Sequence, residues 1–282
     1  MTHLDSFENA KARISKADPN AVLFDDELAE LEKLTGGEID RRIRRFTSAP
    51  LCDEDFTVVY TLYSRLKWLD ALGICLQSSG GTVLEIGSGS TAGIPYALTM
   101  LDASSRYITA NMNKDLTEGL RRNTAALPIT IDIIEDDANN ISEHLPPGSV
   151  DMIVFEHSVN DAVQAILCAN RGIDTAYCDW FGLLPDMIRM INAEYGGGTL
   201  DQSAKPAFVS LVKNCLQVLR PGGYLAMSHY MFQYDLDLGY DPVLWENFLD
   251  IIRPWLSGIA DGNEVAMDAF DPKWWLFFRK NC

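Results

Sequence analysis

The chain has 282 residues, 47% of them hydrophobic, and carries a formal net charge of −17 at pH 7. That length suits one large α/β domain with an attached subdomain. So acidic a surface repels polyanions such as DNA or tRNA, and a short basic cluster at residues 41–45 does not reverse this, so we expect no nucleic-acid partner.

Two further features narrow the class of protein. No apolar run approaches the ~18 residues of a membrane span, and the segment Met1–Pro19 is polar, unlike a secretory signal. We therefore expect a cytoplasmic protein with no membrane partner. The six cysteines form no CxxC pair and match no zinc module, which predicts reduced thiols and no metal site. The oligomeric state is left open, and a homo-oligomer is compatible with the sequence.

The first 80 residues are expected to be helical. A short helix over 25–34 is stopped by Gly36-Gly37. A second helix over 53–76 is predicted because apolar residues recur at three- and four-residue steps, at Val59, Leu62, Leu66 and Leu69. We interpret residues 1–80 as a helical N-terminal lid.

From residue 81 to 282, short apolar runs alternate with helical segments, which predicts right-handed crossovers and a mostly parallel sheet. The stretch 160–203 is longer than one crossover connection needs, and we expect it to form a helical insertion over the mouth of the active site. A hairpin around Asp271-Pro272-Lys273, with strands over 265–270 and 274–279, is expected to add an antiparallel edge. The preceding strands are predicted at 82–86, 106–110, 129–134, 150–155 and 224–228, with helices at 92–102 and 114–126.

The most informative motif is the Gly-rich turn after the first strand, Glu85-Ile86-Gly87-Ser88-Gly89. Glycines let a ligand approach the main chain, and ligands of open α/β sheets bind at the carboxyl ends of strands. A tight strand–helix connection without a ligand is the alternative, because such a turn alone has low specificity. An NAD(P) cofactor fits less well: the third glycine, Gly93, comes one residue late, and Asn111 stands where that fingerprint has an acid.

Several motifs together resemble the class I S-adenosylmethionine-dependent methyltransferases. In the family's order, the chain has an acid and G-x-G on the first strand, polar residues after the second and third strands, an Asp opening the fourth, and Arg220-Pro221-Gly222-Gly223 before the fifth. The likeness covers roughly residues 82–160 and 205–280. It implies a doubly wound, seven-stranded, mostly parallel Rossmann-like sheet with S-adenosylmethionine as cofactor. It assigns cofactor contacts to Glu85, Gly87, Ser88, Gly89, Asn111, Asp136, Asp137 and Ala138, with Glu156 and Tyr63 as further candidates.

Two positions depart from the family's pattern. Thr91 stands where a third glycine is common, and Asn111 replaces the acid that binds the ribose hydroxyls. An amide can still bind a hydroxyl, without charge assistance, and Asn113 is a second candidate for that contact. These departures leave open a protein that binds the cofactor without methylating.

Candidate catalytic residues follow the fourth and fifth strands. His157 and Asp161 are four residues apart, so they share one face if helical, and Asp161 is a candidate to orient His157. His229 follows the fifth strand and would face the same cleft. A histidine suits proton removal from an alcohol or phenol near neutral pH, whereas a structural role in a loop is the alternative for both.

We therefore predict an enzyme that transfers a methyl group to a small-molecule acceptor, with oxygen favoured as the methylated atom and nitrogen left open. Aromatic residues of the insertion are expected to roof the pocket and exclude water; these are Tyr177, Trp180, Phe181 and Tyr195.

Overall fold

The computed structural model describes residues 29–30, 33–35, 37–39, 41–42, 58–76 and 79–282. Most of the predicted helix at 25–34, and most of the predicted lid, lie outside these residues. The second predicted helix is present as α4 (Val58–Cys75), and its expected first turn at 53–57 lies outside the described part.

Strands and helices alternate after α4, as predicted. In chain order they are β1 (Thr82–Ile86), α5 (Gly93–Leu101), β2 (Arg106–Ala110), α6 (Lys114–Thr124), β3 (Thr130–Ile134), the 3₁₀ helix η2 (Ala138–Asn140), α7 (Ile141–His144), β4 (Val150–Glu156), α8 (Val159–Ala169), α9 (Trp180–Gly196), α10 (Leu200–Ser203), α11 (Lys205–Val218), β5 (Leu219–Ser228), α12 (Gln233–Leu238), α13 (Pro242–Glu246), α14 (Phe248–Leu256), β6 (Gly262–Glu264) and β7 (Trp275–Lys280).

The seven strands form one sheet in the order β3-β2-β1-β4-β5-β7-β6. Strands β1 to β5 pair in parallel, and β7 pairs antiparallel with both β5 and β6. The order reverses between β1 and β4, so their carboxyl ends lie at a topological switch point, where open α/β sheets bind ligands. This confirms the predicted doubly wound, mostly parallel seven-stranded sheet.

The C-terminal hairpin differs from the prediction in one strand. Residues 262–264 form the strand that pairs with β7, and of residues 265–270 only Val265 adds a backbone hydrogen bond to it, from its amide to the Phe277 carbonyl at 2.9 Å. The apolar residues that suggested a strand instead belong to a loop that packs on the sheet: Phe270 is buried, with its ring 4.8 Å from that of Trp275. Burial in the core, and not strand pairing, accounts for their apolar character.

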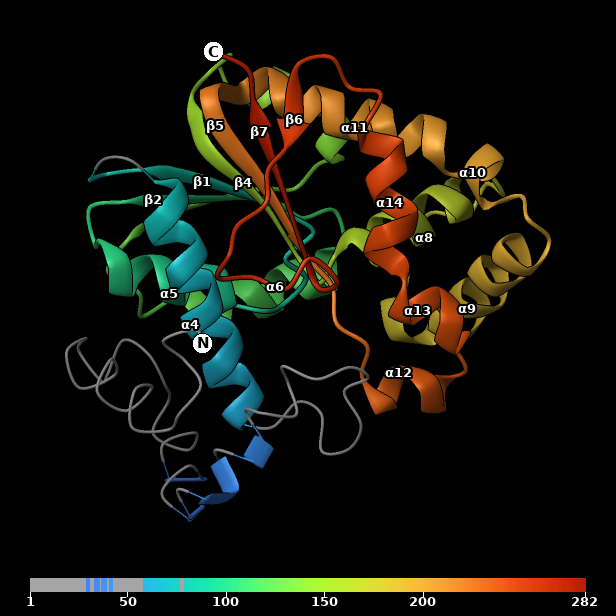
Figure 1. The fold of residues 1–282 in the computed structure, drawn as a ribbon, viewed down its shortest axis with the longest axis horizontal. Helices are drawn as coiled ribbons and strands as arrows, with labels where there is room; N and C mark the ends of the chain where they lie inside the picture. The colour runs from blue at the N-terminus through green and yellow to red at the C-terminus, as the bar shows by residue number, and fades with distance from the viewer. Residues whose placement is uncertain (1–28, 31–32, 36, 40, 43–57, 77–78) are drawn as a thin grey trace.

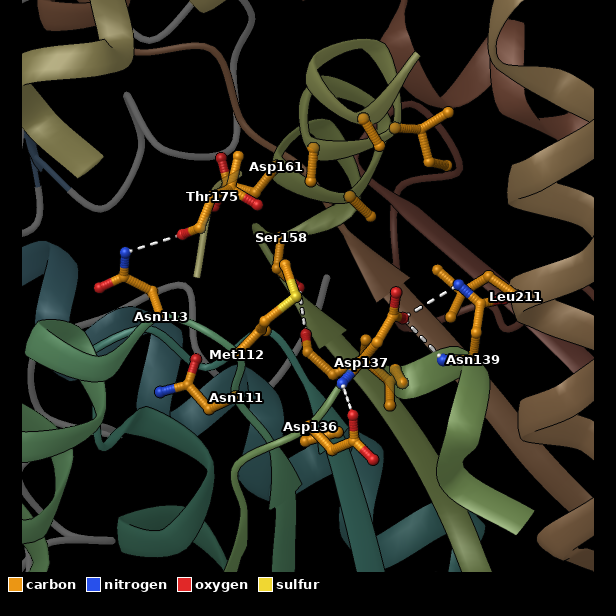
Figure 2. Close-up of a pocket in the computed structure, with 18 of the residues that line it drawn as sticks. Asn111, Met112, Asn113, Asp136, Asp137, Asn139, Ser158, Asp161, Thr175 and Leu211 are labelled. Carbon is orange, nitrogen blue, oxygen red and sulfur yellow. Dashed lines mark hydrogen bonds between the residues drawn. The ribbon is translucent and has the colours of Figure 1, made fainter. Parts of the chain in front are cut away.

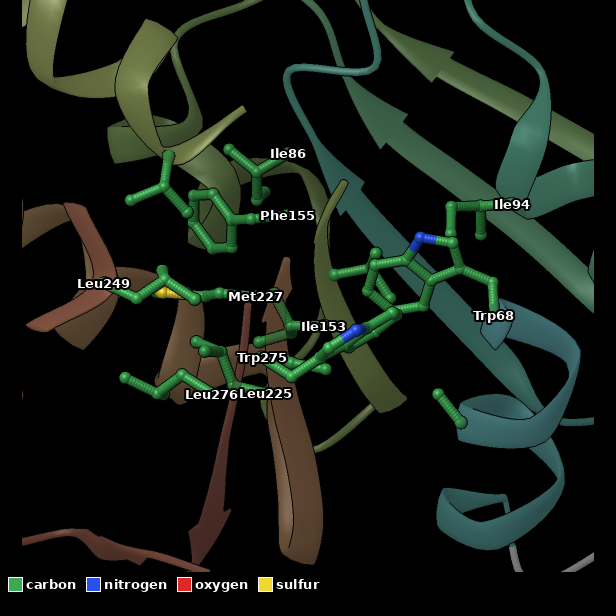
Figure 3. Close-up of a cluster of buried hydrophobic side chains, with 14 of the residues drawn as sticks. Trp68, Ile86, Ile94, Ile153, Phe155, Leu225, Met227, Leu249, Trp275 and Leu276 are labelled. Carbon is green, nitrogen blue, oxygen red and sulfur yellow. The ribbon is translucent and has the colours of Figure 1, made fainter. Parts of the chain in front are cut away.

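The hydrophobic core lies on both faces of the sheet (Figure 3). On one face Trp68 of α4 meets Trp275 of β7 with their rings 4.6 Å apart, and α4 packs against α5. On the other, α11 contacts α7, α8 and α14. Full burial of such large rings contributes strongly to stability. Helix α4 is therefore anchored to the sheet as part of the core.

The predicted insertion is helical. It continues β4 through α8 and then forms α9 and α10, before α11 returns to the sheet. Figure 1 shows α9 beside α12 and α13, on the right of the view. Within the described residues, no helix combines the length and the apolar character of a bilayer-spanning segment.

Candidate functional site

A cavity of about 410 Å³ lies at the carboxyl ends of β1, β2 and β3 (Figure 2). Its floor is the Gly-rich turn and the connections that follow β2 and β3. Helix α8, the start of α9 and one side of α11 form further walls, and Asn170, Ile173, Asp174 and Thr175, which follow α8, also line it. The cavity thus lies at the edge of the sheet where the sequence motifs predicted a ligand.

The main chain of the Gly-rich turn borders this cavity directly. Gly87 and Gly89 both line it, and both have left-handed backbones, with φ of +69° and +58°. The Gly87 amide donates to the Ala110 carbonyl at 3.0 Å, and Ser158 Oγ donates to the Ile86 carbonyl at 2.6 Å. A side chain at Gly87 would be strained and would lie 3.4 Å from the Ser158 Cβ. The turn therefore presents bare main chain to a ligand.

Glu85 and Ser88 are not among the residues that line the cavity; they support the turn from below. Glu85 Oε2 accepts from the Tyr107 hydroxyl at 2.6 Å, and Thr109 Oγ1 donates to Ser88 Oγ at 3.0 Å. Burial, and secondly the nearby Glu156, raise the pKa of Glu85 well above its usual value. Glu85 and Ser88, both predicted to contact the cofactor, therefore hold the turn in its conformation in this structure.

Glu156 and Tyr63 also lie away from the cavity wall. Glu156 Oε1 accepts from Ser64 Oγ at 2.8 Å, and its other oxygen lies so close to Gly93 that a Cβ there would be 2.6 Å away. Burial raises the pKa of Glu156. Tyr63 is buried on α4. Glu156 thus belongs to the contact between α4, α5 and the end of β4.

Asn111 and Asn113, after β2, both line the cavity but have different partners. Asn111 Nδ2 donates to the Gly89 carbonyl at 2.7 Å, which leaves its Oδ1 to accept from a ligand hydroxyl. Asn113 Oδ1 accepts from the Leu116 amide at 3.2 Å and caps α6. Its Nδ2 donates to the Thr175 and Cys178 carbonyls at 3.0 and 3.1 Å. Both amide hydrogens of Asn113 are thus used within the protein, which favours Asn111 for a ribose contact.

Asp136, Asp137 and Ala138, the predicted cofactor contacts after β3, line the cavity. Asp137 Oδ1 accepts from the Asn139 amide at 2.8 Å and caps η2. Asp136 accepts from the Asp137 amide and pairs with His144 Nε2 at 2.8 Å, and the His144 contact is the main cause of the lowered pKa of Asp136. The cavity therefore has a fixed acidic wall at this end.

Asp161 lies in the first turn of α8 and lines the cavity opposite the β2 connection (Figure 2). Its Oδ1 accepts from Asn160 Nδ2 at 2.8 Å. Burial, and secondly Asp235, raise the pKa of Asp161 to about 7. Among the described residues no hydrogen bond joins Asp161 to His157, so the predicted orienting role is not seen in this structure.

His157 and His229 come together, as their positions at neighbouring strand ends suggested, but neither lines the cavity. Their rings stack with centroids 4.9 Å apart, and His157 has a left-handed backbone with φ of 49°. His157 Nδ1 accepts from the Tyr230 amide, and His229 Nε2 contacts the Trp245 carbonyl, which assigns the proton of neutral His229 to Nε2. Burial lowers the pKa of His157 to about 4 and that of His229 well below its usual value.

The predicted aromatic roof is only partly present. Trp180 lines the cavity, whereas Tyr177 and Phe181 are 78% and 66% exposed. The sequence reasoning missed the wall formed by α8. Its cavity-lining residues follow helical spacing and three of them are small, a pattern that could have been found: Ala162, Ala165, Ile166 and Ala169.

Comparison with known proteins gives structural likenesses only. No protein-family model and no curated protein matches the chain. A SAM-dependent methyltransferase from Aquifex aeolicus is 14% identical, covers 77% of this chain and 92% of its own, and superposes with a TM-score of 0.44. An rRNA methylase from Streptococcus thermophilus is 11% identical over 76% and 94%, with a TM-score of 0.42. A protein described as a possible exported protein from Bordetella parapertussis is 15% identical over 97% of both chains, with a TM-score of 0.43.

These likenesses do not assign a family, a cofactor or a substrate to this chain, because all three identities are below 25% and all three TM-scores below 0.5. The fold itself is established by the strand order and by the antiparallel β7. It is the architecture that the resemblance to class I methyltransferases implied.

Proposed function

We propose that this protein is an S-adenosylmethionine-dependent methyltransferase that acts on a small-molecule acceptor. The observation that carries the proposal is the bare main chain of Gly87 and Gly89 at the wall of a cavity of about 410 Å³. A cradle of this kind accepts a ligand that must lie against the backbone. S-adenosylmethionine would supply a methyl group activated on a sulfonium.

The residues around the cavity fit the nucleoside part of that cofactor. Asn111 Oδ1 is available to accept from a ribose hydroxyl, while its Nδ2 holds the Gly-rich turn. Met112 and Ala138 offer apolar surface between the ends of β2 and β3. We assign Gly87 and Gly89 to the methionine part, Asn111 to the ribose, and residues 136–138 to the adenine side.

The acid–base chemistry of the cavity favours Asp161 as the proton acceptor. A group with a pKa of about 7 can remove a proton from an acceptor hydroxyl or ammonium near neutral pH. The two histidines fit that role less well: His157 Nδ1 already accepts from Tyr230, and desolvation weakens the basicity of both rings. We therefore infer transfer to oxygen, or to an amine nitrogen, with Asp161 as the base.

The charge of the protein supports a small molecule over a nucleic acid. The net charge is −17, and the cavity wall carries the carboxylates of Asp136, Asp137, Asp161 and Asp174. Phosphate-rich ligands would be repelled by such a surface.

A binding experiment with two glycine variants tests this function. We expect S-adenosylhomocysteine to bind the purified protein in calorimetry, and Gly87→Leu to weaken that binding at least ~100-fold because a side chain would fill the cradle. Gly198→Leu is the matched control, since Gly198 has a φ of +68° and open space around it, away from the cavity. Absent binding to the wild type, or equal binding by both variants, contradicts the placement of the cofactor.

A further inference from the structure

The segment that joins α8 to α9, here called the roof segment (residues 170–179), borders the cavity. Four of its residues line the cavity, namely Asn170, Ile173, Asp174 and Thr175, and Thr175 is only 4% exposed. At one end it continues the last turn of α8, where the Ile173 amide donates to the Cys168 carbonyl at 3.0 Å. At the other end it leads into α9 at Asp179.

The middle of the roof segment is joined to the rest of the protein by two neighbouring residues. Asn113 Nδ2 donates to the Thr175 and Cys178 carbonyls, and the Lys114 amide donates to the Ala176 carbonyl at 3.2 Å. Within the described chain these are the hydrogen bonds that tie residues 174–178 to other segments. Two further hydrogen bonds are internal, from the Ala176 amide to Asp174 Oδ1 and from Cys178 Sγ to the Thr175 carbonyl, and Lys114 Nζ lies 5.9 Å from the centre of the Tyr177 ring.

Asn113 is suited to connect the roof segment with the ligand edge. Its side chain uses all of its polar atoms, because Oδ1 caps α6 while Nδ2 serves two roof carbonyls. Asn111 and Met112, which line the cavity, lie two residues and one residue before it. A ligand that contacts Asn111 and Met112 is therefore bound by residues that directly precede Asn113, the residue that holds the roof segment.

We propose that Asn113 is a positioning residue that latches the roof segment over the cavity, and that release of this latch sets how fast a bound nucleoside leaves. The nature of the ligand rests on the proposed function; the latch itself rests on the hydrogen bonds above. Asn113 acts on the ligand through the roof, without donating to it.

Asn113→Asp separates the two tasks of this side chain. A carboxylate still caps α6 as an acceptor, but it has no hydrogen to donate to the Thr175 and Cys178 carbonyls. The matched control is Asn192→Asp, which makes the same charge change and loses one amide donor to the Gly239 carbonyl while keeping the acceptor for the Asp241 amide. Asn113→Ser, which also retains a capping oxygen, serves as a second variant if the first does not fold.

Two readouts follow the latch with and without ligand. In the absence of ligand, the rate at which N-ethylmaleimide labels Cys178, resolved by peptide mass spectrometry, reports opening of the roof. We expect Asn113→Asp to raise this rate about tenfold, because each lost hydrogen bond changes an equilibrium by a factor of a few. The dissociation rate of S-adenosylhomocysteine should rise by a similar factor, and Asn192→Asp should change neither rate by more than about twofold.

The outcomes distinguish this inference from the proposed function. If the wild type does not bind S-adenosylhomocysteine, the proposed cofactor fails, while the labelling of Cys178 still decides whether Asn113 holds the roof. Unchanged labelling in Asn113→Asp overturns the latch. Faster labelling with an unchanged ligand dissociation rate overturns its control of ligand exit.

Discussion

The carboxyl edge of the sheet has two unlike halves. Beyond β1, β2 and β3 lies a cavity bordered by glycine main chain and aspartates. Beyond β4 and β5, His157 and His229 are stacked on each other and packed against the rings of Phe232, Trp245 and Phe248. The first half combines an open space with polar groups that face it.

Burial acts in opposite directions on the acids and bases of these two halves. It disfavours the charged form, so it raises the pKa of a carboxyl group and lowers that of an imidazole. Asp161 is thereby brought to about 7, while His157 falls to about 4. The residue type usually associated with neutral-pH proton transfer is moved away from neutrality here, and the carboxylate is moved toward it.

Replacing Asp161 gives the largest expected effect. We expect Asp161→Asn to lower turnover by about 10²–10⁴-fold, the usual contribution of a general base. Wild-type turnover should rise with pH through about 7 as Asp161 loses its proton, and the variant should lose that rise. Steady-state rates from pH 5.5 to 8.5 measure both. The affinity for S-adenosylhomocysteine is the control, and should change little.

Asp235→Asn sharpens the same test. Asp235 raises the pKa of Asp161 by its charge, so its removal should move the rising limb of the pH profile to lower pH. An amide oxygen can still accept from the Trp245 indole and the Phe232 amide, as Asp235 does. If the rising limb of the pH profile does not move in Asp235→Asn, or if Asp161→Asn keeps full turnover, another group accepts the proton.

The sheet and the ligand edge could be predicted from the sequence because they follow from local patterns. Short apolar runs located β1 to β5, and chain order at their carboxyl ends brought Gly87, Asn111 and residues 136–138 to one cavity. The C-terminal hairpin was shifted because a buried loop and an edge strand have the same apolar composition. Pattern alone does not separate them.

The direction of side chains at the ends of β4 and β5 could not be predicted in this way. The left-handed backbone of His157 turns its ring onto His229, and no spacing rule predicts that for a non-glycine residue. The partners of Asn113 are equally non-local, since the carbonyls of Thr175 and Cys178 lie more than sixty residues away in the chain. Both features depend on tertiary contacts.

A smaller effect is expected beyond β4 and β5, where the burial of His157 should make the free energy of unfolding depend on pH. The folded pKa of His157 is about 4 against an ordinary value of 6.5, so below pH 6.5 the unfolded chain takes up a proton that the folded chain does not. The free energy of unfolding should therefore fall as the pH falls from 6.5 toward 4, by about 2–3 kcal/mol from this residue.

His157→Asn should flatten this dependence, since asparagine does not titrate and tolerates a left-handed backbone. Urea unfolding at pH 4.5, 5.5 and 7 measures the slope in both proteins. A residual slope is expected from His229, whose pKa is also lowered. The same slope in both proteins would mean that the His157 ring is solvated and free to titrate, which would restore it as a candidate base.

The smallest expected effect separates two adjacent aromatic residues of the insertion. Trp180 lines the cavity, whereas Phe181, the next residue of α9, is 66% exposed. We expect Trp180→Ala to weaken S-adenosylhomocysteine binding about fivefold, roughly 1 kcal/mol for a lost aromatic contact, and Phe181→Ala to change it less than about twofold. Calorimetry measures the affinity of both variants, and because the two residues are adjacent in α9, an effect on the helix itself should be similar in both. Equal losses of affinity in the two variants would mean that these aromatic residues act by stabilising α9. A loss of affinity confined to Trp180→Ala would mean that the Trp180 side chain contacts the ligand, whereas Phe181 faces the solvent.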